Sequence, residues 1–177
     1  MTEGGNAGGS FEVSGPYELT SKSAQLTAKL ADFNQNGLRP FLEPLLADKK
    51  LVSVAINATA SAQYNPQADS ALKADLQLAN LVVNDPKQQF PATPLEAKLQ
   101  VDASLGKQVA DVRQCQVTLT PTPRATNQVR LSGRVDLSQT NAIQGNLKLV
   151  ADSLDMTSYY ELFAGEKKTG ASKPAGS

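Results

Sequence analysis

The segment from Leu51 to Tyr64 alternates between apolar and polar side chains, and this pattern constrains the fold more than any other feature of the chain. Its apolar members are Val52, Val54, Ile56, Ala58, Ala60, Ala62 and Tyr64. A helix would scatter these residues around its circumference, whereas a strand places them on one face. At ~3.3 Å per residue the strand would be about 45 Å long, well beyond the usual five or six residues. The sequence therefore predicts a long strand with one apolar and one polar face.

The same alternation recurs in six further segments, which predicts seven strands in all. These segments are Leu26–Leu30, Leu72–Leu78, Leu95–Ala103, Cys115–Leu119, Val129–Leu137 and Ile143–Ala151, and either Phe11–Val13 or Tyr17–Leu19 would add an eighth. After Leu78 the apolar phase slips by one residue, which predicts a bulge at Ala79 and Asn80. The connections are short and rich in Pro, Gly and Asn, so an antiparallel meander is the most economical topology.

Two segments have helical spacing of their apolar residues. The first runs from Gly37 to Ala47, with Pro44 expected to kink or divide it. The second runs from Met156 to Ala164, with Asp155 as its N-cap. Both are too short to cover a whole sheet, so we expect them to act as caps.

Long one-faced strands with few helices have three ways to bury their apolar face. They can close into a barrel, stack as a sandwich, or curl into a trough that holds an apolar ligand. The run of small residues at Ala58, Ala60 and Ala62 leaves room above the sheet, which favours the trough. We therefore predict a mainly β fold, a long antiparallel meander of seven or eight strands curled into an open groove with two short capping helices. A closely packed sandwich, in which small residues interleave with large ones, is the alternative.

Charge and composition exclude several classes of function. The chain has 17 basic and 17 acidic residues, so it offers no electrostatic footprint for nucleic acid. It has no histidine and a single cysteine, which excludes histidine catalysis, a histidine-ligated metal and an internal disulfide. Cys115 is in phase with Val117 and Leu119 and is expected to be a small buried residue. We expect no enzymatic activity, cofactor or metal site, although distant carboxylates paired by the fold are the alternative.

The two ends of the chain differ in composition from its middle. Residues 1–10 and 166–177 are rich in Gly, Ser and Ala, and they have too few apolar residues to offset the entropy of ordering. We expect both to be flexible tails. The folded β-groove domain is predicted to span residues 11–165.

Three stretches carry a resemblance to a known family. They are LADFNQNGLRPFLEPLLADKKLVSVAIN at residues 30–57, ALKADLQLANLVVND at 71–85 and LKLVADSLDMTSYYELFA at 147–164. With their helix–strand junctions and patterned apolar positions, they resemble the AsmA-like proteins. These belong with the TamB and YhdP-type repeating β-groove proteins of diderm bacterial envelopes. The similarity covers residues 24–165.

This resemblance implies a β-taco, in which long antiparallel strands bend into a groove with an apolar floor. It also implies a role in phospholipid transport or outer-membrane assembly, without catalytic residues. The family's membrane anchor is not in this sequence, and the chain is too short to bridge a periplasm. We therefore expect a periplasmic segment of a longer protein anchored in the inner membrane. Its expected partners are phospholipid or another apolar chain and neighbouring β-groove segments of the same parent protein. The alternative is a structural or protein-binding β-sandwich module.

The candidate lipid-binding residues are the inward apolar positions of the predicted strands, and packing into an ordinary core is the alternative role for each of them. They are Val52, Val54, Ile56, Leu72, Leu76, Leu99, Val101, Val117, Leu119, Leu131, Val135, Leu147 and Leu149.

Overall fold

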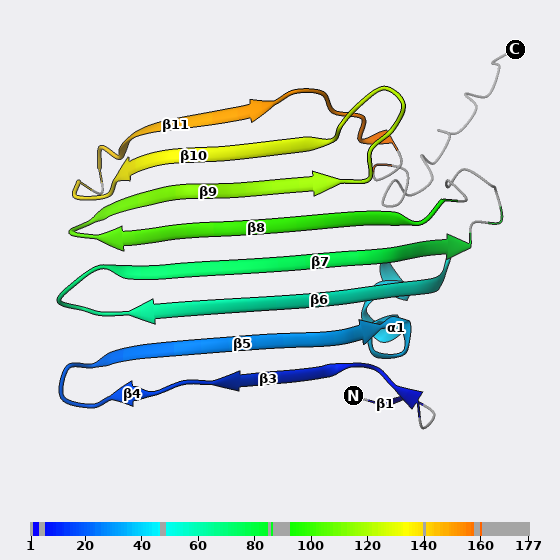
Figure 1. Cartoon of the computed structure of the whole chain (residues 1–177), viewed down its shortest axis with the longest axis horizontal. Coiled ribbons are helices and arrows are strands. Elements are labelled where there is room, and N and C mark those ends of the chain that lie inside the picture. Colours follow the sequence, from blue (N-terminus) through cyan, green and yellow to red (C-terminus); the bar gives the residue numbers. More distant parts are fainter. Residues whose placement is uncertain are drawn as a thin grey trace, which may run out of the picture.

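The computed structural model describes residues 2–3, 6–46, 49–84, 86, 93–139, 141–157 and 160. Its main element is an antiparallel sheet of nine strands (Figure 1). Those strands are β3 (Ser10–Ser14), β4 (Tyr17–Glu18), β5 (Ser23–Asn34), β6 (Lys50–Tyr64), β7 (Ser70–Asn84), β8 (Leu95–Gly106), β9 (Val109–Leu119), β10 (Gln128–Asp136) and β11 (Gln144–Ala151). Two short strands, β1 (Thr2–Glu3) and β2 (Asn6–Ala7), form a separate pair.

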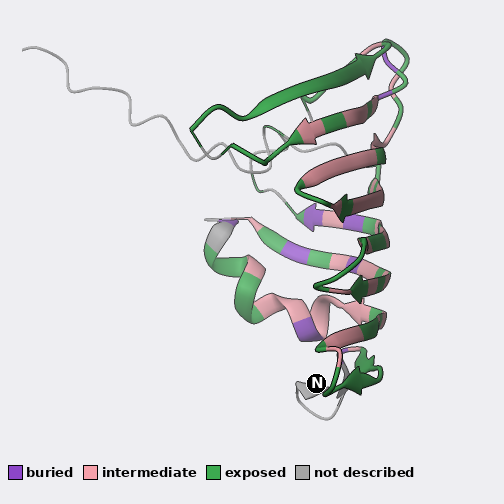
Figure 2. Cartoon of the chain, turned by 90° about the vertical axis from the view of Figure 1, so that its left-hand side faces the viewer, coloured by how far each residue is buried: buried purple, intermediate pink, exposed green. Residues whose placement is uncertain are grey.

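The topology of the main sheet is a simple meander. The strand order is β11-β10-β9-β8-β7-β6-β5-β3, with β4 also paired to β5. The outermost strands do not pair with each other, so the sheet stays open instead of closing into a barrel. Figure 2 shows the main sheet edge-on as a single layer. The described residues therefore contain no second layer of the kind that the closely packed sandwich requires.

All seven predicted strands are present, and several are longer than predicted. Both β6 and β7 contain 15 residues, and β5 and β8 contain 12 each. The two candidates for an eighth strand both exist, because β3 and β4 pair with successive parts of β5. The predicted open antiparallel sheet is thus confirmed.

Bulges interrupt the pairing near one end of the sheet. The predicted bulge after Leu78 is confirmed: the register shifts between Leu78 and Leu81, and Asn80 has a φ of 53°. A second shift lies in β6, between Leu51 and Ala55, and the alternation of apolar residues did not predict it. Its consequence is that Leu51 is buried, whereas the adjacent Val52 is 49% exposed. The prediction that Val52 points inward is therefore wrong.

The first predicted helix is confirmed and begins slightly earlier than expected. Helix α1 (Gln35–Leu42) is capped by Asn34, whose side chain accepts a hydrogen bond of 3.0 Å from the backbone N–H of Asn36. A 3-10 turn, η1 (Glu43–Leu45), follows it, and Pro44 lies in this turn. Pro44 thus divides the element as predicted, because proline lacks an N–H and clashes with the preceding turn.

The core lies at one end of the sheet, beneath α1. Its buried residues are Leu46, Leu51, Val54, Leu81, Val83 and Leu95, and Leu38, Leu42, Ile56 and Leu78 pack against them. Figure 2 shows α1 on one side of the sheet only. The core is therefore confined to the area that α1 and the residues after it cover.

The structure describes most of the N-terminal segment and little of the chain after residue 157. In the segment expected to be a flexible tail, Gly8 is buried, and its carbonyl accepts a hydrogen bond of 3.3 Å from the backbone N–H of Asn34. This packing differs from the expectation for residues 1–10. Of the predicted second helix, Thr157 and Tyr160 are helical, and most of the remainder lies outside the described residues, as do residues 166–177.

Candidate functional site: an apolar sheet face

The strand register brings the apolar residues of eight strands onto one face of the sheet. Because directly paired residues share a face, each row of pairs can be followed across the sheet. One such row is Leu26, Ala62, Leu72, Ala103, Val112, Gly133 and Leu147, and the next is Val13, Ala28, Ala60, Ala74, Val101, Cys115, Leu131 and Leu149. We call this the apolar face.

Twelve of the thirteen candidate residues lie on the apolar face. They are Val54, Ile56, Leu72, Leu76, Leu99, Val101, Val117, Leu119, Leu131, Val135, Leu147 and Leu149. Val52 is the exception, for the reason given above. The face also includes Leu26, Leu30 and Leu78, which the alternation identified but the candidate set omitted, and Phe11 and Val13 of β3. Leu51 takes the buried place that was assigned to Val52.

The apolar face is covered at the α1 end and becomes more exposed away from it. In the core the exposed fraction is between 2% and 7%. Towards the other end Leu26 is 47% and Leu72 is 43% exposed, and on β11 Leu149 is 68% exposed. A row of large apolar side chains that remains half in water is a typical mark of an interaction surface.

The smallest side chains of the apolar face lie along β6. There the small side chains of Ala58, Ala60 and Ala62 are flanked by leucines of the two neighbouring strands, Leu26 and Leu30 on β5, and Leu72 and Leu76 on β7. Neighbouring strands are about 4.8 Å apart, so the flanking leucines are separated by roughly 10 Å at the backbone.

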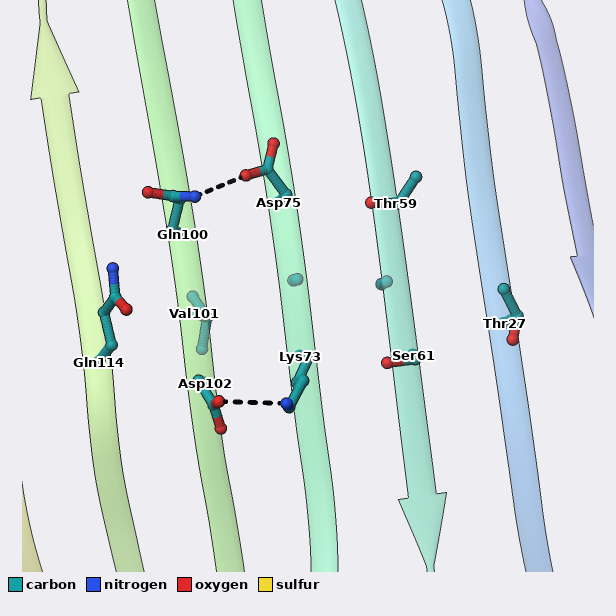
Figure 3. Close-up of a pocket in the computed structure, with 11 residues that line it drawn as sticks. Thr27, Thr59, Ser61, Lys73, Asp75, Gln100, Val101, Asp102 and Gln114 are labelled. Atoms are coloured by element: carbon teal, nitrogen blue, oxygen red, sulfur yellow. Dashed lines mark hydrogen bonds and ion pairs between the residues drawn. The ribbon is translucent and has the colours of Figure 1, made fainter.

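The opposite face of the sheet is polar and carries paired charges. A shallow hollow of about 320 Å³ lies on this face, and Figure 3 shows the side chains that line it. The Lys73 ammonium lies 3.5 Å from the Asp102 carboxylate, and the Gln100 amide donates a 2.9 Å hydrogen bond to Asp75. Because its charged side chains already have partners, the polar face offers no unpaired charge in this hollow to attract an ion.

The Asp102 carboxyl on the polar face has a lowered pKa. The Arg113 guanidinium hydrogen-bonds the Asp102 carboxylate and lowers its pKa, an effect that partial desolvation opposes and the charges of Arg113 and Lys73 reinforce. Arg113 also donates a 2.9 Å hydrogen bond to Ser104. These contacts hold the carboxylate ionised, which suits an ion pair and not a general acid.

A polar clasp fixes the chain beyond β11 at the α1 end of the sheet. Asn127 is only 1% exposed, and its amide donates a 2.7 Å hydrogen bond to the Thr120 carbonyl. Its side-chain oxygen accepts a 2.6 Å hydrogen bond from the backbone N–H of Asp155. The Asp155 carboxylate in turn accepts from the Thr157 hydroxyl, and this hydrogen bond is the largest cause of its lowered pKa. We call Asn127, Thr120 and Asp155 the clasp.

The described residues contain neither a cluster of metal-ligating side chains nor a long apolar helix. No group of three or more His, Cys, Asp or Glu residues in the described part of the chain could hold a metal ion. Cys115 is half-buried on the apolar face, between Val101 and Leu131, where the alternation placed it. Among the residues that the structure describes, no helix has the length and apolarity that a membrane span needs.

The chain matches no protein-family model, and comparisons with curated proteins and with solved structures return no significant match.

Proposed function

We propose that this protein is a non-enzymatic segment of an AsmA-like envelope protein that binds or conducts phospholipid acyl chains on its apolar face. The observation that carries the proposal is a continuous apolar face that eight strands build and that α1 covers at one end only. Long antiparallel strands in an open sheet are also what the resemblance to AsmA-like proteins implies.

The energetics of such a face favour weak, exchangeable binding. A buried CH₂ group contributes about 0.8 kcal/mol, so a sixteen-carbon chain that leaves water completely gains on the order of 12 kcal/mol. A single open sheet covers about half of the surface of the acyl chain, so the free-energy gain falls to on the order of 6 kcal/mol. That gain corresponds to a dissociation constant between about 1 mM and 1 μM before the cost of immobilisation. Binding of this strength suits conduction of lipid better than storage.

The proposal includes the setting of the segment. An open sheet has two free edges, and an edge strand presents unpaired backbone groups that another strand can join. In the parent protein we place neighbouring β-groove segments at these edges, and the whole in the periplasm with an anchor in the inner membrane. Contributions to lipid transport or outer-membrane assembly follow from that setting. Nucleic acid is not among the proposed partners.

A matched pair of variants tests the proposal. Leu76 lies on the apolar face and the adjacent Gln77 on the polar face of the same strand. The full chain is equilibrated with radiolabelled palmitate, and the bound fraction is measured by equilibrium dialysis. We expect Leu76→Glu to lose most of the binding, because it places a charge on the acyl-binding surface, and Gln77→Glu to retain it. Circular dichroism checks that both variants keep the sheet.

Two outcomes would contradict the proposal. The first is the absence of saturable palmitate binding to the unaltered protein. The second is an equal loss of binding in both variants while the sheet stays intact, since binding would then not depend on the apolar face.

A further inference from the structure

We infer that a bound amphiphile lies along the strands with the methyl end of its acyl chain at α1 and its head group at the opposite end, beside Tyr17 and Tyr64. This inference rests on the proposed function and adds a direction to it. It follows from differences between the two ends of the apolar face.

The α1 end of the apolar face is closed. Leu51 and Val83 pair with each other across β6 and β7, and each is less than a tenth exposed. Leu38 and Leu42 of α1 pack over this cluster, together with Ile56 at the start of the open run. These buried apolar side chains offer a polar head group no hydrogen-bond partner. Only the apolar tip of a ligand is compatible with this end.

The other end of the apolar face is open and carries tyrosines. Tyr17 of β4 pairs with Ala24 of β5, and Ala24 pairs with Tyr64 of β6, so the two tyrosines lie in one row across three strands. Their exposed fractions are 60% and 55%. Tyrosine has an apolar ring and a polar hydroxyl, and it gathers where a hydrocarbon region meets water. This row therefore marks the end of the apolar face at which the head group meets water.

The distance between the two ends fits an acyl chain. The open run of β6 from Ile56 to Tyr64 covers eight residue steps, or roughly 26 Å at ~3.3 Å per residue. One leaflet of a bilayer is about half of a hydrocarbon core of about 30 Å, which makes an acyl chain roughly 15 Å deep. With its methyl end against the core, the acyl chain ends about 11 Å before the tyrosine row, and this remaining length holds the head group.

The turns at the open end carry both signs of charge. Lys22 and Lys107 lie in turns at this end, and so does Asp69, whose carboxylate is next to Gly106. Charges of both signs favour neither an anionic nor a cationic head group. The ligand class is therefore an amphiphile with at least one long acyl chain, whatever the charge of its head group.

Single tryptophan reporters test the direction, because the chain has no tryptophan of its own. Leu72→Trp places a reporter near the tyrosine row, and Leu76→Trp places one nearer α1 on the same strand and face. Gln77→Trp, on the polar face, is the control. The probes are palmitic acid brominated near its carboxyl group and palmitic acid brominated near its methyl end. Bromine quenches tryptophan fluorescence only at close range.

We expect the carboxyl-end bromines to quench Leu72→Trp more strongly, and the methyl-end bromines to quench Leu76→Trp more strongly. The ratio of the two quenching constants should invert between the variants, and Gln77→Trp should respond to neither probe. Adding Tyr17→Leu and Tyr64→Leu to each reporter should bring the two ratios closer together. A check with unbrominated palmitate separates quenching from changes in folding.

Equal or reversed ratios, with quenching present in both reporters, overturn the direction while leaving acyl binding on this face intact. Quenching of Gln77→Trp as strong as that of the other two overturns it as well, since the probe would then not select the apolar face. If neither reporter is quenched, the proposed function itself is overturned. The failure of the direction and the failure of the function therefore give different results.

Discussion

Replacing Ala60 by leucine tests whether the apolar face is uncovered, because the sign of the stability change depends on it. Ala60 lies in the middle of β6, between Ala28 of β5 and Ala74 of β7. In a closely packed sandwich, adding methylene groups at such a position costs about 1–3 kcal/mol through strain. On an open face nothing lies above Ala60 for the leucine to strain against.

The expected magnitude follows from the added carbons. Leucine has three more carbons than alanine, which would contribute about 2.4 kcal/mol if they were buried completely, at about 0.8 kcal/mol each. On a face that is half in water, less than half of this gain is realised, and leucine is less favourable than valine or isoleucine in a strand. We therefore expect the free energy of unfolding to stay unchanged or to rise by up to about 1 kcal/mol.

The same substitution should weaken acyl binding, because the leucine fills the space that the small side chains of Ala28, Ala60 and Ala74 leave open. Urea denaturation followed by circular dichroism measures the first effect, and equilibrium dialysis with palmitate the second. Thr59→Leu, on the polar face, is the matched control and should leave palmitate binding unchanged. A fall in the free energy of unfolding by more than about 1 kcal/mol for Ala60→Leu, with an unchanged slope, would refute the reasoning, because it would reveal a packed layer over the face.

Three further predictions concern the C-terminal side of the sheet and are all read out by urea denaturation. Asn127→Ala should lower the free energy of unfolding by about 3 kcal/mol, since it removes two side-chain hydrogen bonds and puts alanine at a φ of 56°, whereas Asn127→Gly should lose only about 2 kcal/mol; equal losses would show that the backbone is not strained. Gly133→Ala should cost about 1–3 kcal/mol, because its φ is 137° and a Cβ there would clash with the carbonyl oxygen of Asn146; an unchanged midpoint would contradict the observed pairing of β10 with β11. The Asp155 carboxyl has a pKa below its ordinary value of 3.8 in the folded protein, so its contribution is complete above pH 3.8 and is lost as the pH falls through the lowered pKa; Asp155→Asn should remove this part of the acid dependence, and an identical acid profile would disprove its role.

The strands were predictable because each one repeats a local rule. A period of two is written into the residues of β6 to β8, and no distant contact is needed to read it. The bulge after Leu78 was predictable for the same reason, since the apolar series itself changes phase there. Most of the candidate site follows directly, because an antiparallel meander in register keeps all apolar positions on one side.

The sequence-based prediction fails where packing between distant residues determines which side chain is buried. The sequence of β6 alternates cleanly through Val52 and Val54, so nothing local indicates that Leu51 takes the buried place. That outcome depends on β7, where Leu81 and Val83 have already changed phase, and on the leucines of α1 that cover them. A bulge in one strand is thus matched by a register shift in the neighbouring strand. The position of that second shift depends on the pairing in the complete sheet.

The same end of the sheet explains how one layer folds without a second. Bulges in β5, β6 and β7 lie near α1, and there the six core residues reach burial that the rest of the face lacks. Outside that core the leucines of the apolar face stay accessible, with Leu26 47%, Leu72 43% and Leu149 68% exposed. Much apolar surface is therefore left for something else to cover. A ligand that binds only the folded sheet stabilises it in proportion to the logarithm of its concentration. Acyl chains on the apolar face would accordingly serve as cargo and as the missing half of the hydrophobic core.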